Sequence, residues 1–162
     1  MSTTRVRSSV EHWPVVTLDI NASPMLDQDF ERMFDAMTRV LKRERRFTLI
    51  IDARGSSSKL TGSVRTVIQS GLSKIYEDLG RYQVATAIVL ESAYAKGLMT
   101  SVLWILQQLG DRDQHNYAVF ATYGEAAKWA VAQLIEAGIT ESSERASLLR
   151  GVTGGSSPTA SP

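Results

Sequence analysis

The sequence predicts an α/β fold: a single three-layer domain with a four- to five-stranded, mainly parallel sheet flanked by helices. Two observations predict it. Every position of Phe47–Asp52 before the aspartate is apolar or β-branched, without alternation, which is typical of a strand covered on both faces. Amphipathic helical segments then alternate with other short apolar segments in the order β-α-β-α-β-α-β-α, which favours right-handed crossovers and parallel strands.

The composition is that of one globular domain able to bury its own core. The chain has 162 residues, 43% of them hydrophobic and 22% charged, and a formal net charge of +1. That charge does not steer the whole molecule toward nucleic acid or an anionic membrane. Cysteine is absent, which excludes disulfides, thiolate nucleophiles and cysteine-ligated metals and favours a reducing cytosol.

We therefore expect a cytoplasmic protein. Residues 1–9 lack the apolar stretch of a secretory signal, and the apolar segment Leu98–Leu109 is too short and too polar to span a bilayer. No membrane span is expected.

The first third of the chain predicts a strand followed by a helix. Residues 1–9 are expected to be a flexible N-terminus, with the alternative that Val6 and Val10 belong to a short edge strand. Val15–Ile20 is the first clear strand. A helix should start at Ser23, whose side chain can cap it, and its apolar residues recur at helical spacing as far as Leu41.

The remainder of the chain continues the alternation. The expected elements are a helix over Val64–Leu79, a strand over Val84–Leu90, a helix over Ala93–Leu109, a strand over Tyr117–Phe120 and a helix over Glu125–Ala137. Gly80 and Gly138 are expected to stop two of these helices. Residues 141–150 could add a short helix. Residues 151–162 are rich in Gly, Ser and Pro and should be disordered, which leaves 10–150 as the domain.

Hydroxyl side chains are concentrated just after the central strand. They are Ser56, Ser57, Ser58, Thr61 and Ser63. In open α/β sheets, ligands and partners meet the fold at the carboxyl ends of the strands. Two interpretations stay open: a phosphorylation or partner-docking loop, or hydroxyls that serve as turn and N-cap residues. A phosphate-binding P-loop is excluded because Lys59 is followed by Leu60 rather than by Ser or Thr.

No catalytic or metal-binding constellation is recognisable. Asp52 ends a strand, as a phosphoacceptor does, but the acidic pair and late lysine of receiver domains are missing, so capping the loop or pairing with Arg54 or Arg65 is favoured. His12 and His115 lack metal-ligand spacing. No catalytic residue, metal or cofactor is expected.

Two further segments suggest surfaces. The expected helix 93–109 is apolar nearly all round, so Met99, Leu103 and Trp104 could form an exposed patch for self-association or another protein, or could belong to a broad core face. The basic run Lys42–Arg46 could contact anionic lipid or nucleic acid. It contains a glutamate and no aromatic residue for base stacking, which favours a solvated helix end, and no nucleic-acid partner is expected.

Several features within roughly Val15 to Leu134 together resemble a known family: the strand that ends in Asp52, the strand Val84–Leu90, and the pattern at the end of the domain. The final strand ends in Phe120, and Glu125-Ala126-x-x-Trp129 opens the last helix, a pattern similar to that of bacterial SpoIIAA-like proteins, which are grouped with STAS and SEC14-type domains. The resemblance implies a sheet flanked by helices. In STAS anti-sigma-factor antagonists the loop after the central strand carries a phosphorylatable serine and docks a kinase, whereas SEC14-type domains enclose a lipid. This chain lacks the antagonists' Asp-Ser-Ser-Gly signature.

We therefore expect a non-enzymatic regulatory or protein-interaction module of STAS-like type, switched at the Ser-rich loop after the central strand. Its partner would be another protein or a second copy of the chain in a homodimer. The alternative is a small-molecule or lipid-binding domain of SEC14-like type.

Overall fold

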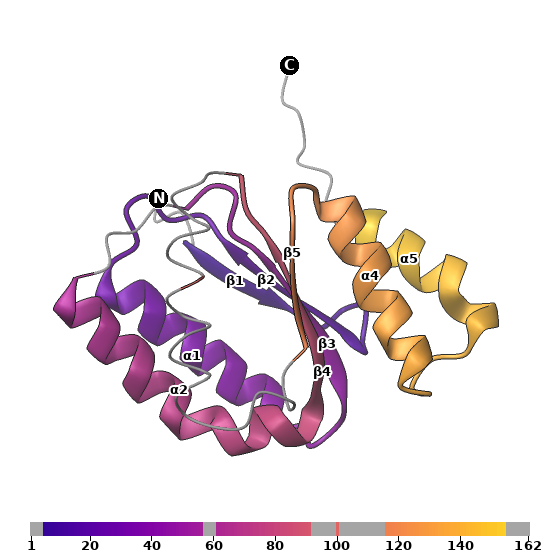
Figure 1. Ribbon diagram of the computed structural model, residues 1–162, viewed down its shortest axis with the longest axis horizontal. Helices are drawn as coiled ribbons and strands as arrows, with labels where there is room; N and C mark the ends of the chain where they lie inside the picture. Colours follow the sequence, from indigo (N-terminus) through magenta and orange to yellow (C-terminus); the bar gives the residue numbers. More distant parts are fainter. Residues whose placement is uncertain (1–4, 57–60, 92–99, 101–115, 155–162) are drawn as a thin grey trace.

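The computed structural model describes residues 5–56, 61–91, 100 and 116–154. Its centre is a five-stranded mixed sheet in which the strands lie in chain order (Figure 1). The strands are β1 (Val6–Ser9), β2 (Val15–Ile20), β3 (Phe47–Asp52), β4 (Gln83–Val89) and β5 (Tyr117–Phe120). β1 pairs antiparallel with β2, and the other neighbours are parallel.

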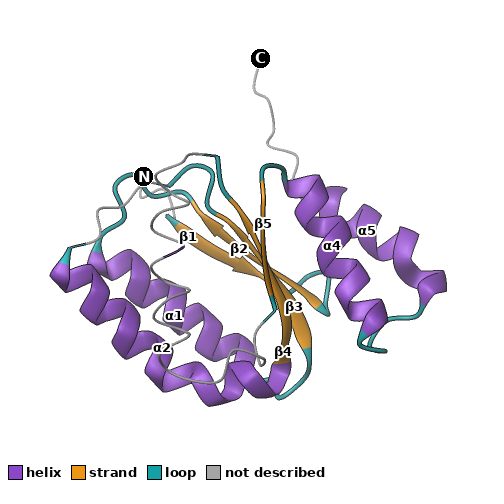
Figure 2. Cartoon of the chain, in the orientation of Figure 1, coloured by secondary structure: helices purple, strands orange, loops and turns teal. Residues whose placement is uncertain are grey.

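Helices cover both faces of the sheet, which gives three layers (Figure 2). α1 (Asp27–Leu41) and α2 (Gly62–Tyr82) pack side by side on one face, and α4 (Tyr123–Glu136) packs over β3 and β4 on the other. α5 (Arg145–Gly154), which follows the 3-10 turn η2 (Ser142–Glu144), lies against α4. The predicted α/β class with flanking helices is confirmed.

The central strand is buried on both sides, as its unbroken apolar run predicted. Phe47 and Leu49 point into the core beneath α1 and α2, and Ile50 belongs to the core beneath α4. None of these three side chains is more than 3% exposed. Burying such side chains stabilises a fold by about 1.5–3 kcal/mol each, so this strand holds the two helical layers together.

The predicted element order is wrong at its start, because two strands rather than one open the sheet. Val6–Ser9, placed by the sequence in either a flexible terminus or an edge strand, forms β1. Only Val6 is buried, and Arg7 and Ser8 are exposed. An edge strand with a solvated face needs few apolar residues, which is why this one left so weak a pattern.

An ion pair between the partly exposed Arg5 and the buried Asp29 joins this edge strand to the first helix. Arg5, just before β1, places its Nη2 3.0 Å from Oδ2 of Asp29, whose side chain is only 2% exposed. The same guanidinium donates to the carbonyl of Pro24. Asp29 also accepts a hydrogen bond from the backbone N–H of Leu26 at 2.8 Å. The predicted cap at Ser23 is therefore wrong: α1 begins at Asp27, and the Asp29 carboxylate serves its first turn.

Two glycines expected to stop helices behave differently. α4 ends at Glu136, and Gly138 follows with φ +72°. The N–H of Ile139 donates to the carbonyl of Leu134 at 2.9 Å, which is the hydrogen bond that characterises a Schellman motif at the end of a helix. Gly80, by contrast, stays helical, and α2 continues to Tyr82.

The last helix reaches further than predicted. It was expected to end by residue 150, but α5 extends to Gly154. Val152, in the segment expected to be disordered, is 1% exposed and belongs to the core beneath α4. The burial of Val152 explains why the helix continues through the two glycines at positions 151 and 154.

The expected helix over 93–109, apart from position 100, lies outside the described residues. So do five candidate residues: Ser57, Ser58, Met99, Leu103 and Trp104.

Candidate functional site at the carboxyl edge of the sheet

The four parallel strands end along one edge, and this edge carries the polar residues that the sequence singled out. Asp19 of β2 lies beside Asp52 of β3 in the sheet register, and the same row continues to Val89 and Phe120. Arg7 of β1 lies beside Asp19 on the other side. Two carboxylates and an arginine therefore occupy adjacent positions where the strands end.

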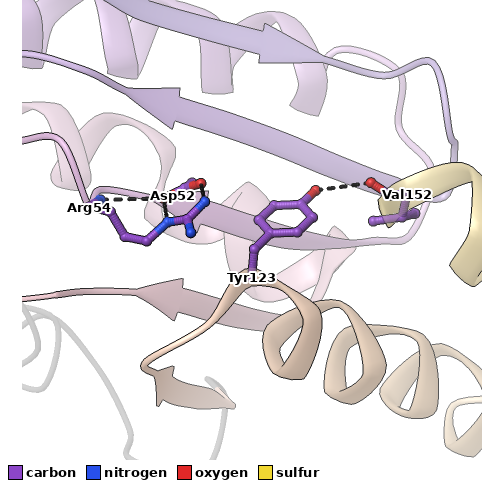
Figure 3. A network of polar contacts seen from close by, with 4 residues as sticks. All are labelled: Asp52, Arg54, Tyr123 and Val152. Carbon is purple, nitrogen blue, oxygen red and sulfur yellow. Dashed lines mark hydrogen bonds and ion pairs between the residues drawn. The ribbon is translucent and has the colours of Figure 1, made fainter. Parts of the chain in front are cut away.

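Asp52 is held by its own loop. Arg54 donates to it through Nε at 2.9 Å and Nη2 at 2.7 Å (Figure 3), and the backbone N–H of Arg54 lies 3.3 Å from Oδ1. This two-pronged hydrogen bond raises the pKa of Arg54 above its ordinary value. Of the sequence alternatives for Asp52, the structure contains the pairing with Arg54. These hydrogen bonds tie the Asp52 carboxylate to the residue two positions later in its own loop.

Asp19 has no such partner at hydrogen-bonding distance within the described residues. Partial burial, and next the nearby Asp52 carboxylate, raise its pKa, while Arg7 and Arg54 act in the opposite direction. Sequence reasoning gave Asp19 no role at this edge, because its proximity to Asp52 depends on the pairing of β2 with β3.

The described hydroxyls have distinct local roles. Ser56 donates to the carbonyl of Ala53 at 2.8 Å and closes the turn after β3. Thr61 is the N-cap of α2, and its Oγ1 accepts the N–H of Val64 at 3.2 Å. These two residues match the interpretation of turn and capping hydroxyls.

Ser63 is different, because its hydroxyl donates across the helix interface. It is exposed in the first turn of α2, and its Oγ donates to Oδ2 of Asp27, the first residue of α1. The two residues are 36 positions apart in the chain. Sequence reasoning missed this contact, because it depends on the packing of α1 against α2.

The pattern that carried the family resemblance has a packing explanation. The rings of Phe120 and Trp129 meet with their centroids 5.6 Å apart, and Ala126 between them in sequence is fully buried. Thr122 caps α4 by accepting the N–H of Glu125 at 3.3 Å. Tyr123 is the first residue of α4, and its hydroxyl donates to the carbonyl of Val152 in α5 at 3.4 Å (Figure 3). These residues join β5, α4 and α5.

Within the part of the chain that the structure describes, no group of three or more His, Asp or Glu side chains could hold a metal ion. No described helix is long and apolar enough to cross a membrane. No protein-family model matches the chain, and comparison with curated proteins and with solved structures found no significant match.

Proposed function

We infer that the protein is a non-enzymatic regulatory module of STAS-like type that docks another protein through the carboxyl edge of its sheet. The observation that carries this proposal is the hydrogen bond from Ser63 to Asp27. An exposed serine at the start of one helix holds the start of its neighbour, so a change at this hydroxyl alters two elements of the edge together.

Phosphorylation of Ser63 would act on this contact directly. A phosphoserine carries roughly −1.5 to −2 charges at neutral pH and cannot donate the hydroxyl hydrogen bond. The start of α2 favours a phosphate, because unpaired N–H groups and the helix dipole make it positive. The Asp27 carboxylate opposes it by charge repulsion. The modified edge would therefore keep α2 in place and release α1, which changes the surface that a partner meets.

The test compares variants as bait for a protein partner. Wild type, Ser63→Ala and Ser63→Glu are immobilised, and the captured proteins are quantified by mass spectrometry. Ser73→Glu is the matched control, because Ser73 is an exposed serine in the same helix that donates only to the carbonyl of Gln69. We expect wild type and Ser73→Glu to capture one protein in stoichiometric amount. Ser63→Glu should capture a different amount of that protein.

Intact-mass measurement of the protein from its native cells adds a second readout, since a phosphate on Ser63 is expected in a fraction of the molecules. Capture that is identical for all variants, or no stoichiometric capture at all, would overturn the proposal. An acyl chain retained in native mass spectrometry would favour the lipid-binding alternative instead.

A further inference from the structure

The segment Lys42–Arg46 concentrates positive charge at the other end of the sheet. It holds four cations and one glutamate, a net charge of +3 within five residues, in a chain whose total is +1. We call Lys42, Arg43, Arg45 and Arg46 the basic cap. All four side chains are exposed. The segment connects α1 to β3, so it lies where the parallel strands begin, opposite the hydroxyl edge (Figure 2).

The structure supplies the aromatic residue that the basic run lacks in sequence. The guanidinium carbon of Arg43 lies 5.1 Å from the centre of the Trp13 ring, and that of Arg45 lies 5.7 Å from it. Trp13 comes from the turn before β2, about thirty residues earlier. Two arginines on one indole gain cation–π stabilisation, which holds both guanidinium groups close to the same ring.

A backbone feature explains how both arginines reach one ring. Glu44, which separates them, has φ +52°, in the left-handed region that residues with a side chain rarely adopt. The N–H groups of Arg43 and Glu44 donate to Val40 and Leu41 at 3.1 and 3.0 Å and close the end of α1. The chain therefore reverses at Glu44, and the residues on either side of it return to Trp13.

No carboxylate of the described residues lies within ion-pairing distance of the basic cap. Among the described residues, none of its four side chains forms an ion pair; the four pairs that occur there are Arg5–Asp29, Arg32–Asp29, Arg54–Asp52 and Arg81–Glu77. Arginine outnumbers lysine three to one, and guanidinium donors match phosphate oxygens in pairs. An exposed, uncompensated set of guanidinium groups is suited to phosphate.

The surroundings favour a nucleic-acid strand over a membrane. Trp13 is only partly exposed and packs on Phe47, with ring centroids 6.0 Å apart, so its indole is not free to insert into a bilayer. The large apolar side chains exposed in the described part are Leu26 and Val119, and neither belongs to this end of α1. Unstacked bases do stack on guanidinium planes.

We propose that the basic cap binds the sugar-phosphate backbone of single-stranded nucleic acid without sequence preference, with a base stacked on the outer face of an arginine that lies over Trp13. This revises the expectation of no nucleic-acid partner. That expectation depended on the small net charge of the chain, on the glutamate within the run and on the absence of an interleaved aromatic residue. Trp13 supplies the aromatic residue from elsewhere in the chain.

The test uses the full chain and a fluorescent oligothymidylate of about 12 nucleotides, a length on the order of one single-strand binding site. Anisotropy is measured at about 50 mM and about 200 mM salt, because neutralised phosphates make binding weaken with salt. We expect wild type to bind at the lower concentration, and Arg43→Ala with Arg45→Ala to weaken binding roughly tenfold, as expected for two lost phosphate contacts. Arg65→Ala with Arg150→Ala removes the same charge from exposed positions outside the cap and should change affinity less than about twofold.

A double substitution to lysine distinguishes the contribution of charge from the contribution of guanidinium stacking. Arg43→Lys with Arg45→Lys keeps the charge, so it should keep most of the salt dependence and lose affinity. Several results would overturn the proposal: no binding at about 50 mM salt, equal losses in the cap and control variants, or stronger binding to duplex DNA. Cap-dependent sedimentation with phosphatidylserine vesicles, without oligonucleotide binding, would also overturn it and assign the surface to a membrane.

Discussion

Gly71 in α2 lies directly against the ring of Phe34 in α1: a methyl group at position 71 would stand 2.3 Å from Cδ2 of Phe34. The glycine lets the two helices approach closely, and this approach also brings Ser63 to Asp27 at their starts. The close approach and the candidate switch are therefore properties of the same interface.

Gly71→Ala should destabilise the fold. The aromatic ring and both helix backbones are packed, so the added methyl forces a shift that costs about 1–3 kcal/mol. Urea denaturation measures the change in the free energy of unfolding. Gly62→Ala is the matched control in the same helix, because a methyl there meets nothing within 4 Å. It should be neutral or stabilising by up to about 0.5 kcal/mol, and an equal loss in both variants would contradict the account.

Asp29→Ala should be more damaging than a loss of charge on the surface. It leaves Arg5 without its carboxylate and removes the acceptor for the N–H of Leu26, so we expect a loss of about 3 kcal/mol. Asp35→Ala, at an exposed position of the same helix, should stay within about 0.5 kcal/mol of wild type.

Combining Asp29→Ala with Arg5→Met tests whether the two side chains act together. The double variant should lose less than the two single losses added, with a coupling of at least about 0.5 kcal/mol. Simple additivity in thermal or denaturant unfolding would show that the pair does not stabilise the fold as a unit.

Asp19→Asn should stabilise the protein at neutral pH. The folded-state pKa of Asp19 is raised by burial and by Asp52, so folding costs free energy once the carboxyl is ionised. That cost is absent below the unfolded-state pKa of about 3.9, grows as the pH rises through the folded-state pKa, and is complete above it.

We expect a gain of about 0.3–0.5 kcal/mol at pH 7, kept small because solvent reaches the Asp19 side chain. The gain should vanish below about pH 4. Asp35→Asn removes the same charge from an exposed site and corrects for net charge. A gain that persists in acid would show that the carboxylate charge is not the cause.

Glu44→Gly should stabilise the end of α1. Glycine adopts a positive φ without a Cβ clash, and we expect a gain of about 0.5–1 kcal/mol. Glu44→Ala removes the same carboxylate and keeps the clash, so it should give no gain in denaturant unfolding. If both variants gain equally, charge rather than backbone conformation is responsible.

Some of the fold could be predicted because its signals are local. The unbroken run Phe47–Asp52 predicted a strand buried on both faces, and Gly138 predicted the end of α4. Boundaries failed where a distant contact decided them. α1 starts at Asp27 because the buried Asp29 carboxylate accepts the N–H of Leu26 just before the first turn. α5 continues past residue 150 because Val152 packs in the core beneath α4.

The candidate surfaces show the same division. Sequence alone determined that hydroxyls follow the central strand and that cations cluster between α1 and β3. Both follow from the residue types that stand next to predicted strands and helices in the chain. Only the tertiary structure decided that Ser63 meets Asp27 and that Arg43 and Arg45 share the ring of Trp13. Periodicity specifies which face of an element is apolar, but not which other element its polar ends will meet. That choice is made when the packed sheet and helices bring distant positions within hydrogen-bonding or stacking distance.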